Sequence, residues 1–339
     1  MLNAAAHNPE ELSQELLDIL VCPRDKWPLS RRGDFLICEH GHQYRVVEGV
    51  PILLVAEAAQ AHIEGTRALQ VAATGDASHL AKFTIGPGDI DPFVRNAIGA
   101  TNGSFYQHLV GKLQEYPIPE LRMAASDGGL FLEVGSNWGR WCIAAARLGY
   151  RAIGIDPSLK SVRAARRVAA QLGVDAEYVV GDARFLPFRD GTFERVFSYS
   201  VLQHLPKQDA ALAIAEINRV LRPGEECLVQ MPNVFGMRCM YHQMRRGFRE
   251  ARDFEVRYWM IPELKREFGK HLGSAQVEVD GFFSLNPQIS DVRLMPRKYR
   301  ALIYASEGLR RMSAAIPALQ YAADSVYVRA VKERAGDVS

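Results

Sequence analysis

The chain reads Phe131-Leu132-Glu133-Val134-Gly135-Ser136-Asn137-Trp138-Gly139 where an apolar run meets a glycine-rich turn. Gly135 permits a sharp turn, and Gly139 lets the following helix come close to the strand or to a ligand. Glu133 places a carboxylate directly before the turn, where it can face a cationic group. Such a turn is a weak signal by itself, because many glycine turns are purely structural. The residues that follow decide its meaning.

Strands and helices alternate after this turn. We expect strands at 130–134, 152–155, 176–180, 195–198 and 226–230, with helices at 140–148, 159–172 and 210–221 between them. This alternation predicts βαβ units and a parallel sheet. Two late strands, at 275–283 and 325–331, follow insertions, which suits a final strand that pairs antiparallel at the edge. The fold class expected is therefore α/β, with a doubly wound, mostly parallel sheet of seven strands.

Two further carboxylates follow the next two strands. Asp156 ends the second strand, where a carboxylate can accept hydrogen bonds from both hydroxyls of a ribose. Asp182 follows the third strand, where it can accept from the exocyclic amine of an adenine. Each acid alone could be a helix N-cap. Three acids at three successive strand ends instead indicate a nucleoside-binding site, because parallel strands end at one edge of the sheet.

With these motifs in place, residues 130–232 resemble a class I S-adenosylmethionine-dependent methyltransferase with a Rossmann-like fold, of the subgroup that modifies small molecules and lipids. The matching motifs include Gly154-Ile155-Asp156, Gly181-Asp182-Ala183 and Val220-Leu221-Arg222-Pro223-Gly224. The resemblance implies S-adenosyl-L-methionine as the cofactor, with its methionine part at Glu133 and Gly135, its ribose at Asp156 and its adenine at Asp182. The full cofactor-binding set expected is Glu133, Gly135, Asn137, Gly139, Asp156, Asp182, Ala183 and Ser198.

One position departs from the family pattern. Asn137 stands where the family usually has glycine. Asparagine tolerates left-handed backbone better than other non-glycine residues. We therefore expect the loop to keep its shape.

Residues 9–55 form a smaller N-terminal α+β unit. A helix is expected at 9–19, with Asn8 as its N-cap, followed by strands at 35–38 and 43–46 and an apolar run at 50–55. Cys22 and Asp25 are three positions apart, and a second pair, Cys38 and His42, follows some thirteen residues later. Such a split spacing suits tetrahedral zinc.

This unit also resembles known modules. Residues 16–55 are similar to the zinc-ribbon-like domain of the tRNA-methyltransferase activator subunit, and to the N-terminal zinc module of a ribosomal RNA guanine methyltransferase. Asp25 stands where the zinc-binding members have cysteine, although carboxylate is an acceptable zinc ligand. Two interpretations stay open: zinc held by Cys22, Asp25, Cys38 and His42, with His40 as a substitute, or a metal-free ribbon held by apolar residues such as Leu20, Leu29 and Leu36.

The rest of the chain divides into a linker with lead-in helices at 56–128 and a main domain at 129–334, with insertions at about 233–259 and 285–321. No apolar run reaches the ~18 residues of a transmembrane helix, and no secretory signal is visible. The five cysteines are scattered, which argues for a reducing, cytoplasmic compartment. Arginines gather between Arg238 and Arg257, but below the density of a nucleic-acid-binding tail.

Methyl transfer needs a positioned acceptor and, for an oxygen, often a base. His204 follows the fourth strand and is the candidate base; the structural alternative is a histidine that packs against or caps the next helix. Gln203 and Tyr199 are candidates for orienting the substrate. Tyr106 lies in a polar and aromatic loop at 101–106 that suits closure over the cofactor. The 233–259 insertion suits a lid, whose Arg245, Arg246 and Arg249 are candidates for clamping phosphate or carboxylate.

These features favour O-methylation of a small molecule, a glycan or a lipid-linked intermediate. RNA methylation is the runner-up because of the N-terminal unit. Against it, the chain has no Asn-Pro-Pro-Tyr-type tetrad after the fourth strand and no dense basic face, so nucleic acid is not the expected partner. A nicotinamide-dependent oxidoreductase would need a Gly-x-Gly-x-x-Gly turn, which is absent. A non-catalytic activator partner would not need the three acids.

Overall fold

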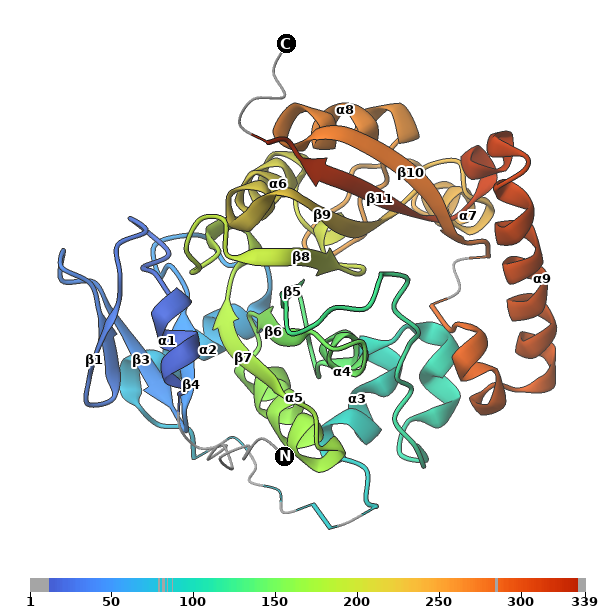
Figure 1. The fold of residues 1–339 in the computed structure, drawn as a ribbon. Helices are drawn as coiled ribbons and strands as arrows, with labels where there is room; N and C mark the ends of the chain where they lie inside the picture. Colours follow the sequence, from blue (N-terminus) through green and yellow to red (C-terminus); the bar gives the residue numbers. More distant parts are fainter. Residues whose placement is uncertain are drawn as a thin grey trace.

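The computed structural model describes residues 12–78, 80, 83, 85–86, 88–283 and 286–334. Within this part of the chain, the strands form one sheet in the order β1-β2-β3-β4-β7-β6-β5-β8-β9-β11-β10 (Figure 1). Their bounds are β1 Ser30–Arg32, β2 Phe35–Ile37, β3 Gln43–Val47, β4 Val50–Leu53, β5 Leu130–Val134, β6 Arg151–Asp156, β7 Ala176–Gly181, β8 Phe193–Ser198, β9 Leu221–Pro232, β10 Gly273–Gly281 and β11 Ser325–Lys332.

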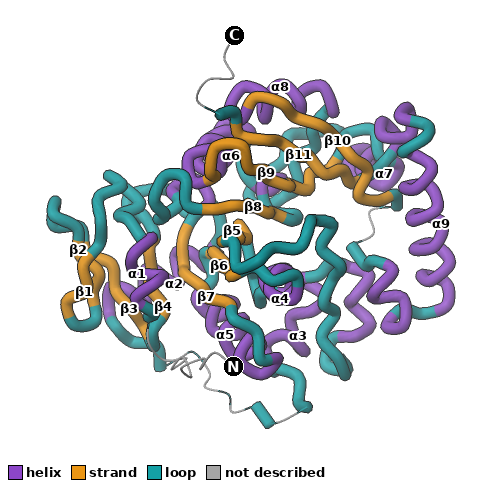
Figure 2. The backbone as a smooth tube through the Cα atoms, viewed as in Figure 1, coloured by secondary structure: helices purple, strands orange, loops and turns teal. Residues whose placement is uncertain are grey.

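Helices and short 3₁₀ turns connect these strands (Figure 2). The α-helices are α1 Gln14–Ile19, α2 Ile63–Thr74, α3 Pro92–Thr101, α4 Arg140–Arg147, α5 Leu159–Leu172, α6 Lys207–Val220, α7 Met237–Arg245, α8 Ile261–Leu272 and α9 Arg297–Ser313. The 3₁₀ turns are η1 Ser104–Leu109, η2 Ala183–Phe185, η3 Leu202–His204, η4 Ile289–Leu294 and η5 Pro317–Ala322.

The seven strands of the main domain confirm the predicted fold class. Neighbours from β7 through β6, β5 and β8 to β9 are all parallel. The order along the sheet reverses between β5 and β8, so this is a doubly wound arrangement. Apolar side chains alternate between the two faces of the sheet. Leu132 and Val134 of β5 pack in the core that includes α6 and α8, whereas Phe131 packs in the core that includes α4 and α5.

The position predicted for the last strand is wrong. β11 pairs antiparallel with both β9 and β10, so it lies inside the sheet, and β10 forms the edge. The side chains of the two strands explain this arrangement. Most of β11 is buried, as a strand with neighbours on both sides requires, whereas the first six residues of β10 alternate between half-buried and exposed.

The turn predicted at 222–224 lies within the span of β9. Pairing with β8 passes from Phe193 opposite Leu221 to Arg195 opposite Glu226, so residues 222–225 bulge out of the ladder. Gly224 in this bulge has a φ of 83°, a left-handed conformation that favours glycine.

The N-terminal unit continues the main sheet. β4 pairs parallel with β7, with Ile52 opposite Val180 and Leu53 opposite Gly181. Its helix α1 begins at Gln14, and the Ser13 side chain caps it by accepting from the Leu16 amide. The N-cap predicted at Asn8 is therefore wrong for this helix, and Asn8 itself lies outside the described residues. β1 was not predicted because its three residues are all exposed and have no apolar pattern.

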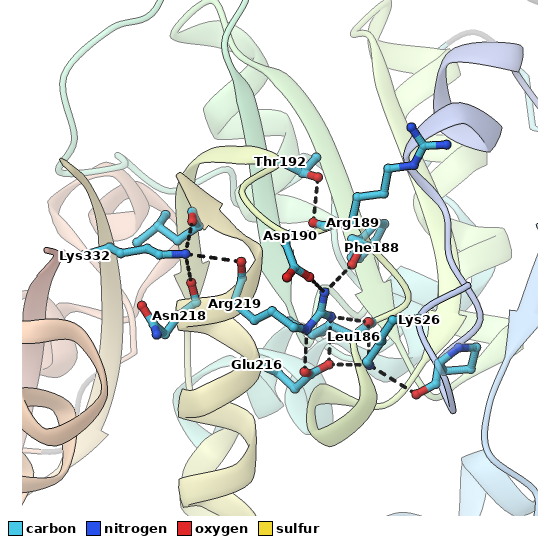
Figure 3. A network of polar contacts seen from close by, with 12 residues as sticks. Lys26, Leu186, Phe188, Arg189, Asp190, Thr192, Glu216, Asn218, Arg219 and Lys332 are labelled. Atoms are coloured by element: carbon cyan, nitrogen blue, oxygen red, sulfur yellow. Dashed lines mark hydrogen bonds and ion pairs between the residues drawn. The ribbon is translucent and has the colours of Figure 1, made fainter. Parts of the chain in front are cut away.

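A polar network also joins this unit to the main domain (Figure 3). The Lys26 ammonium donates to Glu216 Oε2 on α6 at 2.7 Å and to the carbonyl of Leu186 at 3.2 Å. Arg219, on the same helix, contacts Glu216 and Asp190 and donates to the carbonyls of Leu186 and Phe188. Ion pairs and hydrogen bonds therefore join the N-terminal unit to α6 and to the loop after η2.

Within the described residues, no helix is both long and apolar enough to cross a membrane. None of the five cysteines is in a disulfide, and all are buried. The cytoplasmic location stays a prediction.

Candidate functional site

One cavity of about 630 Å³ lies at the carboxyl ends of β5, β6, β7 and β8. Its lining includes Glu133, Gly135, Asp156 and Asp182, which come from three successive strand ends. The strand order reverses between β5 and β8 at this edge, which is where open α/β sheets bind ligands. The fold thus brings together the carboxylates that the sequence analysis singled out.

The turn after β5 depends on left-handed backbone. Gly135, Asn137 and Gly139 have φ values of 82°, 47° and 81°. A Cβ atom at Gly135 would lie 2.2 Å from Cγ2 of Val201, and one at Gly139 would lie 2.4 Å from the Tyr178 hydroxyl. Asn137 adopts the left-handed conformation expected of it and lines the cavity, whereas Gly139 does not reach the lining.

Glu133 is a buried carboxylate beside this turn. Its side chain is 2% exposed, and its Oε2 accepts a hydrogen bond from the Cys142 amide at 2.8 Å. Burial raises the pKa of Glu133 to about 8, because low-dielectric surroundings disfavour the charged form. Glu133 is therefore mostly protonated at neutral pH in the free chain. A cationic ligand group beside it would favour its ionised form.

Asp156 holds the turn and the start of α5 together. Its Oδ2 accepts from the Asn137 amide and its Oδ1 from the Ser158 amide, each at 2.9 Å. Burial raises the pKa of Asp156 to about 6 in spite of these two bonds. Each carboxylate oxygen keeps a second lone pair for a ligand hydroxyl.

Asp182 differs from the other two acids because it already has a charged partner. The Arg184 side chain donates from Nη2 to Oδ2 at 2.7 Å, and from Nε to Oδ1 at 3.1 Å and to Oδ2 at 3.2 Å. The backbone amide of Arg184 also donates to Oδ1. Arg184 also binds Asp209 and the Ala59 carbonyl. A ligand amine at Asp182 would share the carboxylate with this arginine, while the neighbouring Ala183 lines the cavity.

His204 lies on the cavity wall in η3. Its ring stacks on Phe254 with a centroid distance of 4.0 Å, and its Nδ1 lies 2.7 Å from the Phe254 carbonyl. Because a carbonyl only accepts, Nδ1 carries the hydrogen, and the unprotonated Nε2 accepts a hydrogen bond from the Gln203 side-chain amide at 3.3 Å. Burial lowers the pKa of His204, so the neutral form dominates at pH 7. His204 therefore both packs against Phe254 and carries an unprotonated ring nitrogen.

The predicted substrate residues Tyr199, Gln203 and Tyr106 and the predicted cofactor residue Ser198 divide into two groups. Tyr199 and Gln203 line the cavity, and the Tyr199 hydroxyl donates to Asp280 at 3.0 Å. Tyr106 is buried and donates to Asp291, outside the lining, and Ser198 is buried and donates to the Val134 carbonyl.

The three arginines of the 233–259 insertion do not line the cavity. Arg249 pairs with Glu255, Arg246 donates to the Val256 carbonyl, and Arg245 lies over the Tyr241 ring.

Two charged residues of the lining were missed by the sequence analysis. Arg140 is 7% exposed, and its Nη1 has no hydrogen-bond partner among the described residues. Asp324 is 1% exposed; its Oδ1 accepts from the amides of Arg238 and Cys239, and its Oδ2 has no such partner.

The sequence holds a signal for Arg140 only, because the position of Asp324 depends on how β11 pairs. Arg140 directly follows the turn. Asp324 precedes β11, which runs antiparallel to β9, so its start lies at the edge where the parallel strands end.

A second cluster lies in the N-terminal unit. One ligand atom each from Cys22, Asp25, Cys38 and His42 lies within 4.8 Å of the others. His42 Nδ1 is 3.4 Å from Cys22 Sγ and 3.5 Å from Cys38 Sγ. His40 lies outside this set and contacts Asp25 instead, at 2.7 Å. Two thiols, an imidazole and a carboxylate in this arrangement suit a tetrahedral zinc ion.

Comparison with known proteins finds relatives of the first half of the main domain. Residues 131–224 match a family described as a methyltransferase domain. Norajmaline N-methyltransferase of Rauvolfia serpentina is 33% identical over 101 residues, which make up 29% of this chain and 34% of that protein. A ubiquinone biosynthesis O-methyltransferase of Brucella anthropi is 32% identical over 98 residues, 29% of this chain and 39% of that protein. The chain thus spans little more than a third of the length of these curated relatives, and the class I methyltransferase resemblance is confirmed at the level of this domain.

A shorter stretch of the chain has a different relative. A UPF0434 protein of Vesicomyosocius okutanii is 50% identical over 48 residues, which make up 14% of this chain and 81% of that protein. This stretch belongs to the family of that protein. Among solved structures, a complex of a methyltransferase activator and a putative methyltransferase from Haloferax volcanii aligns with a TM-score of 0.46 and 18% identity, over 72% of this chain and 94% of that one. The zinc-ribbon character of the N-terminal unit stays a prediction.

Proposed function

We propose that this chain, which carries a methyltransferase domain at residues 131–224, transfers a methyl group from S-adenosyl-L-methionine to an oxygen of a small molecule, a glycan or a lipid-linked intermediate. One observation carries this proposal: Glu133, Asp156 and Asp182 line a single cavity beside a left-handed glycine turn. Buried acids beside such a turn suit a cationic amino-acid nucleoside better than the pyrophosphate of a dinucleotide.

The residues fit the parts of this cofactor. Glu133 would face its amino group, Asp156 would accept from its ribose hydroxyls, and the region of Asp182 and Ala183 would hold its adenine. When bound, the cofactor supplies an electrophilic methyl group on a sulfonium. The chain must then position the acceptor and remove its proton.

Two groups support an acceptor with a hydroxyl. His204 lies at the cavity wall and is neutral at pH 7, as a general base must be, and its unprotonated Nε2 would exchange the Gln203 amide for the acceptor hydroxyl. Asp324 lines the cavity, and its buried Oδ2 has no partner among the described residues, so we infer that it would accept the hydrogen of a bound hydroxyl. Leaving a buried carboxylate oxygen unpaired is costly, which itself favours a polar ligand at this end.

Isothermal titration calorimetry tests the proposal. We expect the chain to bind S-adenosyl-L-methionine and S-adenosylhomocysteine, and Asp156→Asn to weaken both about ten-fold or more, since hydrogen bonds to a charged group contribute about 1.5–3 kcal/mol each. Asp175→Asn is the matched control, because Asp175 is exposed before β7 at the opposite edge of the sheet. Binding of a nicotinamide dinucleotide, but of neither methionine compound, would overturn the proposal.

A structural zinc ion is the second part of the proposal. Cys22, Asp25, Cys38 and His42 would hold it and so tie the two hairpin ends of the N-terminal unit together. This ion would have no part in methyl transfer, because its ligands belong to the N-terminal unit and none of them lines the cavity.

A further inference from the structure

Arg140 is a buried cation in the wall of the candidate active site. It is the first residue of α4, is 7% exposed and lines the cavity. Its Nη1 has no hydrogen-bond partner, and its guanidinium forms no ion pair within the described part of the chain. The guanidinium carbon instead lies 5.3 Å from the centre of the Trp141 ring and 5.6 Å from that of Tyr199. These rings compensate part of the charge but give its N–H donors no oxygen acceptor.

Two acids interact with this guanidinium through space, but each has other partners. Glu133 accepts from the Cys142 amide at 2.8 Å, and Asp291 accepts from the Tyr106 hydroxyl at 2.7 Å. The charge of Arg140 favours the ionised form of both acids, yet burial raises the pKa of both above its ordinary value. A buried guanidinium without a bonded anion is costly, and this cost favours an anionic ligand beside it.

The position of Arg140 separates it from the acids proposed to bind the ribose and the adenine. Those acids follow β6 and β7, whereas Tyr199, over which Arg140 lies, follows β8 on the other side of β5. The hydroxyls of Tyr199 and Ser325 both donate to Asp280 Oδ2, at 3.0 Å and 2.7 Å. Ser325 begins β11 directly after Asp324, so Arg140 and Asp324 border the same half of the cavity.

We propose that Arg140 binds an acidic group, a carboxylate or a phosphate, of the methyl acceptor. This assignment rests on the proposed function and narrows its acceptor to a compound that carries both an acid and a hydroxyl. A planar guanidinium binds either acidic group through two parallel N–H···O bonds. Trp141 lines the cavity too, and its buried Nε1, a donor, also has no partner among the described residues. The hydroxyl of the same acceptor would face Asp324 and His204.

Calorimetric titration of the full chain with inorganic phosphate, and separately with acetate, tests the anion site. The chain is first saturated with S-adenosylhomocysteine, so that the cofactor's part of the cavity is filled. We expect a single saturable site for each anion. Arg140→Met keeps an unbranched stem without the charge and should weaken both anions by about ten-fold or more, because hydrogen bonds to charged groups are the strong ones. Arg140→Lys should retain part of the binding, since an ammonium keeps the charge but lacks the planar fork.

A matched control and a second readout accompany this titration. Arg147 is exposed in the last turn of the same helix and does not line the cavity, so Arg147→Met should bind both anions as the unmodified chain does. Thermal unfolding of the ligand-free Arg140→Met variant should give an unfolding temperature equal to or above that of the unmodified chain, because no paired charge is lost.

Cofactor analogues show where the acidic group comes from, because the methionine part of the cofactor also carries a carboxylate. 5′-Methylthioadenosine has the nucleoside and the thioether of the cofactor but no amino acid. We expect Arg140→Met to bind S-adenosylhomocysteine and 5′-methylthioadenosine with nearly unchanged affinities. If the variant loses affinity for the first but not for the second, or if S-adenosylhomocysteine displaces phosphate, Arg140 binds the cofactor's own carboxylate and the acceptor assignment is wrong.

Two further results would overturn the proposal. One is that neither phosphate nor acetate binds the unmodified chain. The other is that Arg140→Met binds both anions in full; together with a lower unfolding temperature, this would leave Arg140 as a packing partner of Trp141 and Tyr199. Failure of the proposed function is distinguishable from both. In that case neither S-adenosyl-L-methionine nor S-adenosylhomocysteine binds, while phosphate titration of the ligand-free chain still reports on Arg140.

Discussion

At the scale of single residues, the environment gives three similar carboxylates three different properties. Glu133 is buried with one amide donor, and its pKa rises to about 8. Asp156 is buried with two amide donors, and its pKa rises to about 6. Asp182 is paired with Arg184. Desolvation dominates where compensating partners are few, so Glu133 and Asp156 respond to pH differently.

Cofactor affinity should therefore depend on pH. Because the pKa of Glu133 is about 8 in the free chain, a cationic ligand must displace a proton at pH 7. Affinity for S-adenosyl-L-methionine should rise by up to about ten-fold per pH unit between pH 6 and 8 and then level off. Titrations in buffers of different ionisation enthalpy measure the released proton. Glu133→Gln should bind more weakly and without this slope; a flat profile in the unmodified chain would contradict the assignment.

His204 should limit turnover as a base. His204→Ala should lower the rate by roughly 10²–10⁴-fold, the usual contribution of general base catalysis, with little change in cofactor affinity. Since burial lowers its pKa below the ordinary value, the rate at saturating S-adenosyl-L-methionine should be constant at and above neutral pH and fall at lower pH as the imidazole becomes protonated. His271→Ala on α8, away from the cavity, is the control. Near-normal turnover of His204→Ala would leave His204 as a packing partner of Phe254.

At the scale of elements, the turn between β5 and α4 is tightly constrained. Gly135→Ala should lower the free energy of unfolding by about 2–4 kcal/mol for two reasons. The alanine would be strained in the left-handed conformation, and its Cβ would clash with Val201. Gly173→Ala is the matched control: its φ is 63°, but a Cβ there meets nothing within 4 Å, so only about 1 kcal/mol should be lost. Urea unfolding measures both; equal losses would show that the contact with Val201 is not strained.

At the scale of the whole molecule, the N-terminal unit is fastened by pairing of β4 with β7 and by the network around Lys26 and Glu216 (Figure 3). Its own interior is small. Leu20, Leu29 and Leu36 are buried in the same core cluster as residues of the main sheet. Loss of order in this unit should therefore reach the main domain.

Metal removal tests that coupling. Elemental analysis should find about one zinc per chain, because the four ligands form one tetrahedral site. Removing the zinc with a chelator should lower the unfolding temperature. His42→Ala should lose the metal, whereas His40→Ala, the control outside the ligand set, should keep it. Protein prepared with ample zinc yet containing none would establish the metal-free ribbon held by its leucines.

The sequence by itself determined the parallel core and the strand-end acids. Helix α5 and strand β5 have the predicted bounds, and Glu133 and Asp156 meet in one cavity as expected. Both results follow from local patterns: apolar periodicity specifies an element, and parallel strands must end at one edge. The left-handed Asn137 could be predicted for the same reason, since it depends on one residue's own backbone preference.

Only the tertiary structure decided which distant segments meet. It joined β4 to β7, placed β11 inside the sheet, brought Asp324 to the cavity and kept Arg249 away from it by pairing with Glu255. Such outcomes depend on contacts between residues far apart in the chain, for which no local sequence pattern exists.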